Sequence, residues 1–217
     1  MLESQFKRNP DDDFINKCKK LEHFVTQPWA VEAVLEKELL TKNVFDPCVG
    51  SGVIAEIACR QGYNVFSSDI HDWGYEKLNI LNDFLEIKES PFSKKEFTVV
   101  MNPPFSKAED FVKKCFELGA RKVLCYQRFS WYEGSYESGK KRGKFWEKYR
   151  PTRIWLCGER ASCWRYDLYK SRDKESGNIY DYDGRKLSES STAHAWFVWE
   201  RGHLPVANCG HIFKSKN

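Results

Sequence analysis

The segment Val44-Phe45-Asp46-Pro47-Cys48-Val49-Gly50-Ser51-Gly52 decides the fold of this chain. It passes from an apolar run to one acidic residue and then to a glycine-rich turn. The residues that follow place Ile54, Ile57 and Ala58 at helical spacing, and Gly62 lies where a helix would end. This order predicts a strand, a tight glycine loop and a helix, in which the glycines allow the backbone to approach a ligand closely.

Three acidic residues follow one another near the ends of apolar runs. Asp46 ends the first strand, where a carboxylate would repel pyrophosphate and attract an ammonium or sulfonium group. Asp69 lies at the carboxyl end of the next predicted strand, residues 64–70, and is placed to accept from ribose hydroxyls. Asp83 lies beside Phe84, a pair suited to the amino group and the ring face of adenine. Each acid alone is better explained as a turn or cap residue, but the ordered set indicates a binding site.

The tetrapeptide Asn102-Pro103-Pro104-Phe105 is suited to activating a nitrogen atom. An exocyclic amino or amide nitrogen is a poor nucleophile, because its lone pair is delocalised into a ring or a carbonyl group. The Asn102 side-chain oxygen and the Pro103 carbonyl would accept from its two N–H groups and pull the nitrogen toward a tetrahedral geometry. The prolines fix φ and remove competing backbone donors, and Phe105 offers a flat face for stacking. The alternative is a proline-rich turn after a strand, with an aromatic side chain packed beneath it.

Together these motifs resemble those of class I S-adenosylmethionine-dependent methyltransferases of the amino-methylating group, which includes the DNA adenine-N6 enzymes. Residues 46–52 match the glycine-rich motif of that family, and residues 102–105 match its catalytic motif. Thr26-Gln27-Pro28-Trp29 resembles the segment that flanks methionine in families whose cofactor region comes first. The resemblance extends over residues 26–119, and residues 195–202 resemble small phage and prophage methyltransferases more loosely.

The resemblance implies S-adenosyl-L-methionine as the cofactor and assigns site residues by their match to the family's motifs. The implied catalytic residues are Asn102, Pro103, Pro104 and Phe105. The implied cofactor-binding residues are Thr26, Pro28, Asp46, Pro47, Cys48, Gly50, Gly52, Asp69, Ile70, Asp83 and Phe84. We expect no metal site, because the eight cysteines contain no Cys-x-x-Cys pair of the kind that binds zinc.

Predicted strands alternate with predicted helices along most of the chain. Strands are expected at residues 64–70, 97–101, 122–126, 153–157 and 195–199. Helices are expected from Pro28 and from residues 106–109, which read as a capping box, with Gly119 as the stop. This alternation predicts an α/β fold with a Rossmann-like, doubly wound and mostly parallel sheet, whose ligand site lies at the carboxyl ends of the strands. The resemblance adds a seven-stranded sheet with one antiparallel strand, for which residues 195–199 are our candidate.

Length and composition indicate one domain of an intracellular protein. The chain has 217 residues, and we expect a loose polar N-terminal arm at 1–22 and a single methyltransferase domain at 23–217. With 35 basic and 31 acidic residues, the net charge of +4 permits nucleic acid as a partner without demanding it. No stretch approaches the length of a membrane span, and the start lacks a signal-peptide pattern. Because most cysteines sit in apolar runs, we expect a reduced, cytoplasmic protein with no membrane partner.

Two stretches interrupt the alternation of strands and helices. Residues 128–150 mix basic and aromatic side chains, as do surfaces that hold phosphates and stack bases. The candidate substrate-binding residues there are Arg128, Trp131, Tyr132, Lys140, Lys141, Arg142 and Lys144. The alternative is a solvated basic turn beside a helix that buries Phe145, Trp146 and Tyr149. Residues 163–191 are polar and rich in tyrosine, and the sequence does not decide between a substrate-contacting insertion and a mobile loop.

The leading interpretation is methyl transfer to N6 of adenine in DNA, with the base flipped out of the duplex against Phe105. The chain shows no separate target-recognition domain after the catalytic motif, so we expect a short or relaxed sequence preference. Among related families, the same tetrapeptide also serves enzymes that methylate N2 of guanine in RNA or the glutamine amide of proteins. An interpretation from another class, a non-catalytic S-adenosylmethionine-binding interaction module, would require a broken motif, which is not seen. The sequence leaves a monomer and a dimer equally open.

Overall fold

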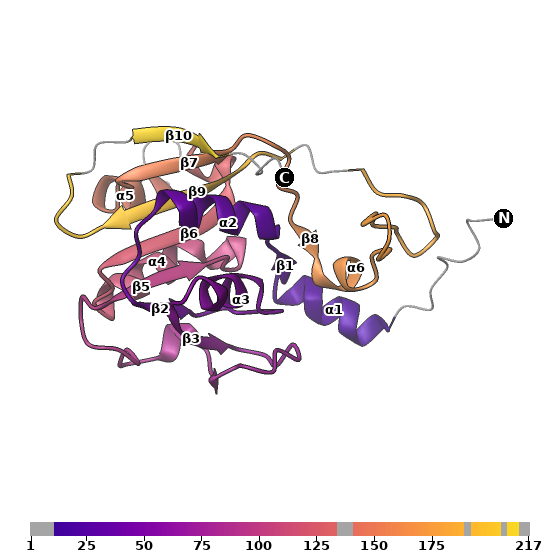
Figure 1. Ribbon diagram of the computed structural model, residues 1–217, viewed down its shortest axis with the longest axis horizontal. Helices are drawn as coiled ribbons and strands as arrows, with labels where there is room; N and C mark the ends of the chain where they lie inside the picture. The colour runs from indigo at the N-terminus through magenta and orange to yellow at the C-terminus, as the bar shows by residue number, and fades with distance from the viewer. Residues whose placement is uncertain (1–10, 134–140, 189–191, 205–207, 213–217) are drawn as a thin grey trace.

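Eight strands form one sheet in the computed structural model, which describes residues 11–133, 141–188, 192–204 and 208–212 (Figure 1). The order of the strands across the sheet is β10-β7-β9-β6-β5-β2-β3-β4. Their bounds are β2 (Asn43–Asp46), β3 (Asn64–Asp69), β4 (Ile80–Leu81), β5 (Phe97–Met101), β6 (Lys122–Arg128), β7 (Arg153–Cys157), β9 (His194–Glu200) and β10 (Asn208–Ile212). The strands therefore alternate with helices along the chain but are reordered in space, as in doubly wound α/β folds.

The mostly parallel sheet expected from the sequence is confirmed. Every neighbouring pair is parallel except those made by β9, which runs antiparallel to both β6 and β7. Its register with β6 runs from Lys122 opposite Glu200 to Arg128 opposite His194. The aromatic-rich segment at 195–199 is thus the antiparallel strand, as predicted. β10 adds an eighth strand at the edge, parallel to β7, beyond the seven that were expected.

Helices cover both faces of the sheet (Figure 1). The covering helices are α2 (Pro28–Lys37) and α3 (Val53–Arg60) on one face, and α4 (Ala108–Glu117) and α5 (Lys141–Lys148) on the other. The buried indole of Trp196 in β9 donates to the carbonyl of Ala30 at 2.9 Å, which fastens α2 to the sheet. Within the described part of the chain, no helix is long and apolar enough to cross a membrane. With both faces covered, a ligand reaches the strands best at the edge where their carboxyl ends meet.

The helix after the catalytic motif begins differently from the predicted capping box. A short 3-10 turn, η3 (Phe105–Lys107), comes first, and α4 starts at Ala108 without a side-chain cap. The backbone N–H and the hydroxyl of Ser106 both donate to Glu22, at 2.9 and 3.2 Å. The capping-box prediction was therefore wrong, because a partner 84 residues away binds the serine that the local pattern assigned to the helix.

A small side lobe lies next to the main sheet (Figure 1). It consists of α1 (Asp12–Lys20), β1 (Phe24–Val25), β8 (Trp164–Arg165) and α6 (Tyr166–Lys170). β1 and β8 pair in antiparallel orientation, so that the beginning of the chain and a segment near residue 165 form one two-stranded sheet. The lobe therefore joins two regions that the sequence gave no reason to connect.

The N-terminal arm differs from the loose segment that its polar composition predicts. Residues 12–20 form α1, and the Asp11 carboxylate caps this helix by accepting from the Phe14 N–H at 3.1 Å. Ile15 and Cys18 are buried by the side lobe, although most other residues of the helix are exposed. Two buried positions one turn apart do not form a recognisable apolar face in a short charged segment. Only the tertiary contact therefore identifies this helix.

The tyrosine-rich insertion is ordered over its described residues, 163–188. The Arg165 guanidinium donates to both carboxylate oxygens of Asp167, at 2.5 and 2.8 Å, and the Tyr182 hydroxyl donates to the same buried carboxylate. These hydrogen bonds lower the pKa of Asp167 even though burial alone would raise it. A charged network therefore ties the insertion to β8 and to the side lobe.

Candidate functional site

A pocket lies where β2, β3 and β5 end, next to the side lobe. Its empty volume, including the part open to solvent, is about 950 Å³. The predicted site residues that line it are Thr26, Pro47, Cys48, Gly50, Asp69, Ile70, Asp83, Phe84, Asn102 and Pro104. Of the predicted catalytic and cofactor-binding residues, the other five, Pro28, Asp46, Gly52, Pro103 and Phe105, are not among its lining residues. The fold thus gathers residues from five separate stretches of sequence around one cavity.

Two glycines shape the loop between β2 and α3. Gly50 and Gly52 have φ angles of 53° and 87°, in the left-handed region that favours glycine. A Cβ on Gly50 would lie 2.6 Å from Nε2 of His23, and one on Gly52 would lie 2.3 Å from the ring of Tyr75. Both positions require glycine, because the backbone conformation and the close approach of a side chain each exclude a larger residue.

Asp46 is buried behind the glycine loop, with 1% of its surface exposed. Its Oδ1 accepts from the Cys48 N–H at 3.4 Å, whereas Oδ2 has no partner among the described residues. Burial raises the pKa of this carboxyl group well above its ordinary value, and the nearby Asp69 raises it further. An unpaired buried carboxyl oxygen is costly unless a donor or a cation reaches it. Asp46 is therefore a buried carboxyl group that a donor or a cation would stabilise, although it is not among the lining residues.

Asp69 connects the two strands that flank the pocket. Its Oδ2 accepts from the Gly50 N–H at 2.8 Å, and its Oδ1 accepts from the His71 N–H and the Trp73 indole at 3.0 and 3.2 Å. Burial raises the pKa of Asp69 although these hydrogen bonds oppose the shift. A carboxylate has about four acceptor sites, so ribose hydroxyls can still bind. The structure adds to the predicted ligand role a second one, which is to hold the glycine loop in place.

The third acid begins a short turn at the pocket wall. Asp83 accepts from the Leu85 N–H at 2.9 Å and caps the 3-10 helix η2 (Phe84–Glu86). The Phe84 ring is almost fully buried and packs against Phe111 at a centroid distance of 5.1 Å, so only part of it faces the pocket. Ile70, by contrast, is 50% exposed and lines the cavity. Ile70, predicted only as a cofactor-binding residue, therefore offers a more accessible apolar surface than Phe84, the predicted adenine-side residue.

The orientation of the Asn102 amide is set by β1. Its Nδ2 donates to the Phe24 carbonyl and to the Thr26 hydroxyl, each at 2.9 Å. Both N–H donors are thereby used, and the amide oxygen lies on the opposite arm as an acceptor. The Pro103 carbonyl accepts from Gln127 at 3.3 Å, and a carbonyl oxygen can accept a second hydrogen bond. The motif therefore carries two acceptors whose positions are fixed by residues outside it.

The ring of Phe105 is less open than the sequence indicates. It stacks on Phe24 with centroids 5.3 Å apart, and the Arg128 guanidinium lies 4.7 Å from its centroid. Such a guanidinium above an aromatic ring is a favourable cation–π contact. A base that stacks on Phe105 would have to displace Arg128 or stack against it.

The basic and aromatic stretch after β6 divides between core and surface. Trp131, in the 3-10 helix η4 (Phe129–Tyr132), is 5% exposed and packs against Phe145, Trp146 and Phe197. Its assignment to base stacking is corrected here, because the hydrophobic core already covers its ring. Tyr132 is 39% exposed, Arg128 and Lys144 are exposed, and Lys140 and the side chains of Lys141 and Arg142 lie outside the described residues.

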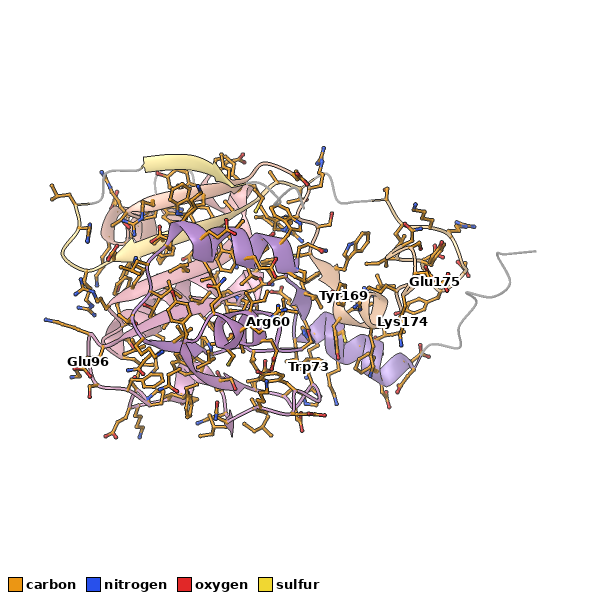
Figure 2. The ribbon with its side chains drawn as sticks, viewed as in Figure 1. Arg60, Trp73, Glu96, Tyr169, Lys174 and Glu175 are labelled. Atoms are coloured by element: carbon orange, nitrogen blue, oxygen red, sulfur yellow. The ribbon has the colours of Figure 1, made fainter. Side chains whose placement is uncertain are left out.

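A cluster of aromatic side chains at the mouth of the pocket was missed by the sequence analysis. His23 lies 4.2 Å from Trp73 and 4.4 Å from Tyr166 between ring centroids, and both His23 and Trp73 line the pocket. Figure 2 places Trp73 next to α1 of the side lobe. Burial lowers the pKa of His23 to about 3, and its Nδ1 has no partner within the described residues. No sequence signal links these positions, because they come from three distant segments.

Comparisons with known proteins place the fold but not the function. No protein-family model matches the sequence, and no curated protein matches it either. A candidate hemolysin from Lactococcus lactis is 10% identical with a TM-score of 0.52, over 83% of this chain and 91% of that protein. A candidate hemolysin from Streptococcus thermophilus is 9% identical with a TM-score of 0.50, over 83% and 67%. A candidate RNA methyltransferase from Pyrococcus horikoshii is 15% identical with a TM-score of 0.47, over 89% and 98%. At these identities the first two likenesses show a shared fold alone, and the third carries no argument.

Proposed function

We propose that this protein transfers a methyl group from S-adenosyl-L-methionine to an exocyclic amino nitrogen of a nucleic-acid base. The observation that carries the proposal is the fixed Asn102 amide, whose oxygen is left as an acceptor beside the pocket that the predicted cofactor residues line. Two hydrogen-bond acceptors on adjacent residues can bind the two N–H groups of such a nitrogen and so free its lone pair for reaction. The unpaired carboxyl oxygen of Asp46 fits the positive charge of the proposed cofactor.

The residues around the pocket suit the separate parts of S-adenosylmethionine. Asp69 would bind its ribose hydroxyls and Asp83 with Ile70 its adenine, while Asp46, which is buried behind the lining residues, would act on its positive charge from there. When bound, this cofactor supplies a methyl group already activated by a sulfonium. The protein then needs mainly to align the acceptor nitrogen, because positioning alone can supply much of the acceleration.

Asn102 and Pro103 perform the chemistry that belongs to the chain itself. The Asn102 oxygen and the Pro103 carbonyl accept from the two N–H groups of the target nitrogen, which withdraws its lone pair from conjugation. Gln127 and Thr26 hold these acceptors in place, so little reorganisation is needed when the substrate arrives. The proton that the nitrogen loses leaves after methyl transfer, and no general base is required before it.

The proposed target is N6 of adenine in DNA, with a short or relaxed sequence preference. A base taken out of its duplex would stack against the Arg128 guanidinium that covers Phe105 of the catalytic motif, or would displace it. Lys20 and Lys107 are exposed at the pocket lining, where they can meet backbone phosphates. Guanine N2 in RNA and a glutamine amide present a nitrogen of the same kind, and the experiment below separates them.

The test is incubation of the protein with methyl-labelled S-adenosylmethionine and unmethylated DNA, RNA or protein, followed by mass spectrometry of the digested products. We expect labelled N6-methyladenine from DNA. Labelled N2-methylguanine from RNA or labelled glutamine from protein would replace the proposed substrate. Cofactor binding without any transfer would favour the non-catalytic binding module.

Asn102→Ala is the matched variant for this assay. It should lose about 100-fold or more in turnover, comparable to removing one preorganised group from other active sites, while its affinity for the cofactor is retained. Full activity in this variant would remove the catalytic assignment of Asn102.

A further inference from the structure

We infer that Thr26 is a positioning residue for Asn102, and that the pairing of β1 with β8 holds it in that role. This inference rests on the function proposed above and deepens it. The family resemblance places Thr26 beside the methionine part of the cofactor, but the structure directs its hydroxyl to the catalytic amide. Thr26 is 4% exposed, so its rotamer is held by packing as well as by this hydrogen bond.

The chemistry of an amide explains why this contact matters. An Asn side chain has a donor arm and an acceptor arm, and only the acceptor arm can bind the N–H groups of a target nitrogen. The Phe24 carbonyl accepts only, so it selects the donor arm of Asn102, and the Thr26 hydroxyl provides the second acceptor. If the amide turned end for end, its oxygen would face the Phe24 carbonyl and its N–H groups would face the substrate. β1 therefore disfavours the orientation that cannot react.

β1 is too short to hold this position by itself. It has two residues, Phe24 and Val25, which pair with Arg165 and Trp164 of β8. Further hydrogen bonds join the two segments on both sides of this pairing. The Tyr166 backbone N–H donates to the His23 carbonyl at 2.9 Å, and the side-chain amide of Gln27 donates to the Ser162 carbonyl at 2.8 Å.

The described insertion residues, 163–188, thereby help to orient Asn102 in the proposed catalytic site. The Asn102 amide also contacts Cys163, whose pKa it lowers although burial dominates and raises that pKa overall. The Arg165–Asp167 ion pair and the Tyr182 hydroxyl fix β8 from the other side. The described part of 163–188 thus acts through β1 on the orientation of Asn102, more than 70 residues away from either Thr26 or Phe24 in the sequence.

Two substitutions at Thr26 test the assignment. Thr26→Val removes the hydroxyl and keeps the branched shape, and Thr26→Ser keeps the hydroxyl. We expect Thr26→Val to lower kcat by about 10-fold or more, since small misplacements in an active site are costly, and to leave the cofactor Kd unchanged in calorimetry. Thr26→Ser should recover most of the lost kcat.

Thr152→Val is the matched control. Thr152 is also buried, and its hydroxyl donates to the Val198 carbonyl at 2.9 Å, at the opposite end of the sheet. This variant loses a comparable hydrogen bond and should keep kcat. A weakened cofactor Kd with normal kcat in Thr26→Val would make Thr26 a cofactor ligand and overturn the inference, as would equal kcat in the Val variants at 26 and 152.

A nuclear magnetic resonance measurement tests the same contact without turnover. The side-chain amide signals of Asn102 can be assigned by their loss in Asn102→Asp. We expect both protons to be protected from solvent exchange in the wild type, and one to lose protection in Thr26→Val but not in Thr26→Ser. Unprotected amide protons in the wild type, or no change in Thr26→Val, would contradict the positioning role. Protected protons in a protein that methylates no substrate would instead refute the proposed function and leave the contact intact.

Discussion

At the scale of single residues, Asp46 and Asn102 show opposite ways of preparing a polar group for a ligand. Asn102 has its donors satisfied by β1, so its remaining oxygen is oriented. Asp46 keeps an unpaired oxygen and a raised pKa, so it holds a proton that a cation would displace. Hydrogen bonds thus fix the orientation of the Asn102 amide, whereas burial disfavours the charged form of the Asp46 carboxyl group.

This contrast predicts that cofactor binding releases a proton. In the free protein the raised pKa keeps Asp46 protonated above the pH at which an ordinary aspartate ionises, and a bound cation lowers that pKa again. Calorimetry above the ordinary aspartate pKa of about 3.9, in buffers with different ionisation enthalpies, should show a buffer-dependent binding enthalpy, because each released proton is taken up by the buffer. Asp46→Asn should bind the cofactor more weakly and abolish the buffer dependence. Equal enthalpies in all buffers for the wild type would contradict the proposed partner of Asp46.

At the scale of secondary structure elements, a buried ion cluster joins α2 to the sheet at the edge opposite the pocket. Glu38, which follows α2, accepts from Lys122 at the start of β6 and from Arg153 at the start of β7, at 2.9 and 2.6 Å. The Trp155 indole donates to it at 2.8 Å. Burial alone would raise the pKa of Glu38, but the hydrogen bonds from Arg153, Trp155 and Lys122 outweigh it and lower the pKa.

Glu38→Gln should therefore destabilise the fold without changing the site. Breaking a buried ion pair by removing one partner costs up to about 3–5 kcal/mol, and because Lys122 and Arg153 keep Glu200 as a counter-ion, the loss should lie below that limit. Urea unfolding is the measurement, and Glu32→Gln is the control, since the exposed pair of Glu32 with Arg60 should contribute at most about 1 kcal/mol. Cofactor affinity should be unchanged in both variants. A Glu38→Gln variant as stable as the control would show that the cluster is not a stabilising element.

α5 lies away from the pocket, and this position affects which basic residues we propose to contact a nucleic acid. Trp146 of α5 packs against Phe197 and Trp199, which lie opposite Cys125 and Val123 in the first half of β6. The pocket lies beyond the other end of that strand. We therefore propose Lys20 and Lys107, which line the pocket, as phosphate contacts in addition to the basic residues proposed at 140–144.

Salt-dependent DNA binding separates these two surfaces. For a Lys20→Ala/Lys107→Ala variant, we expect the slope of log affinity against log salt to fall by about two units, one for each lost phosphate contact. A Lys140/Lys141/Arg142/Lys144→Ala variant should change the slope less. Fluorescence anisotropy across several salt concentrations measures both. A larger change in the second variant would assign the phosphate contacts to the α5 segment instead.

At the scale of the whole molecule, two buried histidines make the stability depend on pH. Burial lowers the pKa of His23 to about 3 and that of His194 to about 4, so the folded protein keeps both rings neutral. In the unfolded chain each ring takes up a proton below its ordinary pKa of about 6.5. The free energy of unfolding therefore falls as the pH decreases from about 6.5 toward the pKa values of the folded state. The decrease is up to about 1.4 kcal/mol per pH unit for each histidine. Asp46 and Asp69, whose pKa values are raised, act in the opposite direction over the acid range.

A comparison of variants isolates the contribution of the histidines. His194→Phe should reduce the loss of unfolding free energy between about pH 6.5 and 5, and a His23→Phe/His194→Phe variant should reduce it further. Urea unfolding at several pH values measures this loss. An identical pH dependence in the wild type and both variants would show that neither ring is kept neutral by the fold.

The sequence by itself determined the features that depend on short-range patterns. The strand, glycine loop and helix from residue 44 to residue 60 follow from apolar spacing and from two positions that only glycine can occupy. The alternation of strands and helices then predicted the doubly wound sheet, and the family resemblance predicted its antiparallel strand. The pocket residues Asp69, Asp83 and Asn102 were predictable because each follows a strand or begins the next turn, and carboxyl ends of parallel strands meet at one edge.

Only the tertiary structure decided what each side chain faces. Trp131 looked like a stacking residue but is buried, because core packing and base stacking require the same aromatic surface. Ser106 matched a capping box but binds Glu22. The strands β1 and β8 are two residues each, too short to leave a periodic pattern, and they come from segments far apart in the sequence. Their pairing fixes Asn102 through contacts that no local pattern encodes, since hydrogen bonds between distant segments form only when the whole chain has folded.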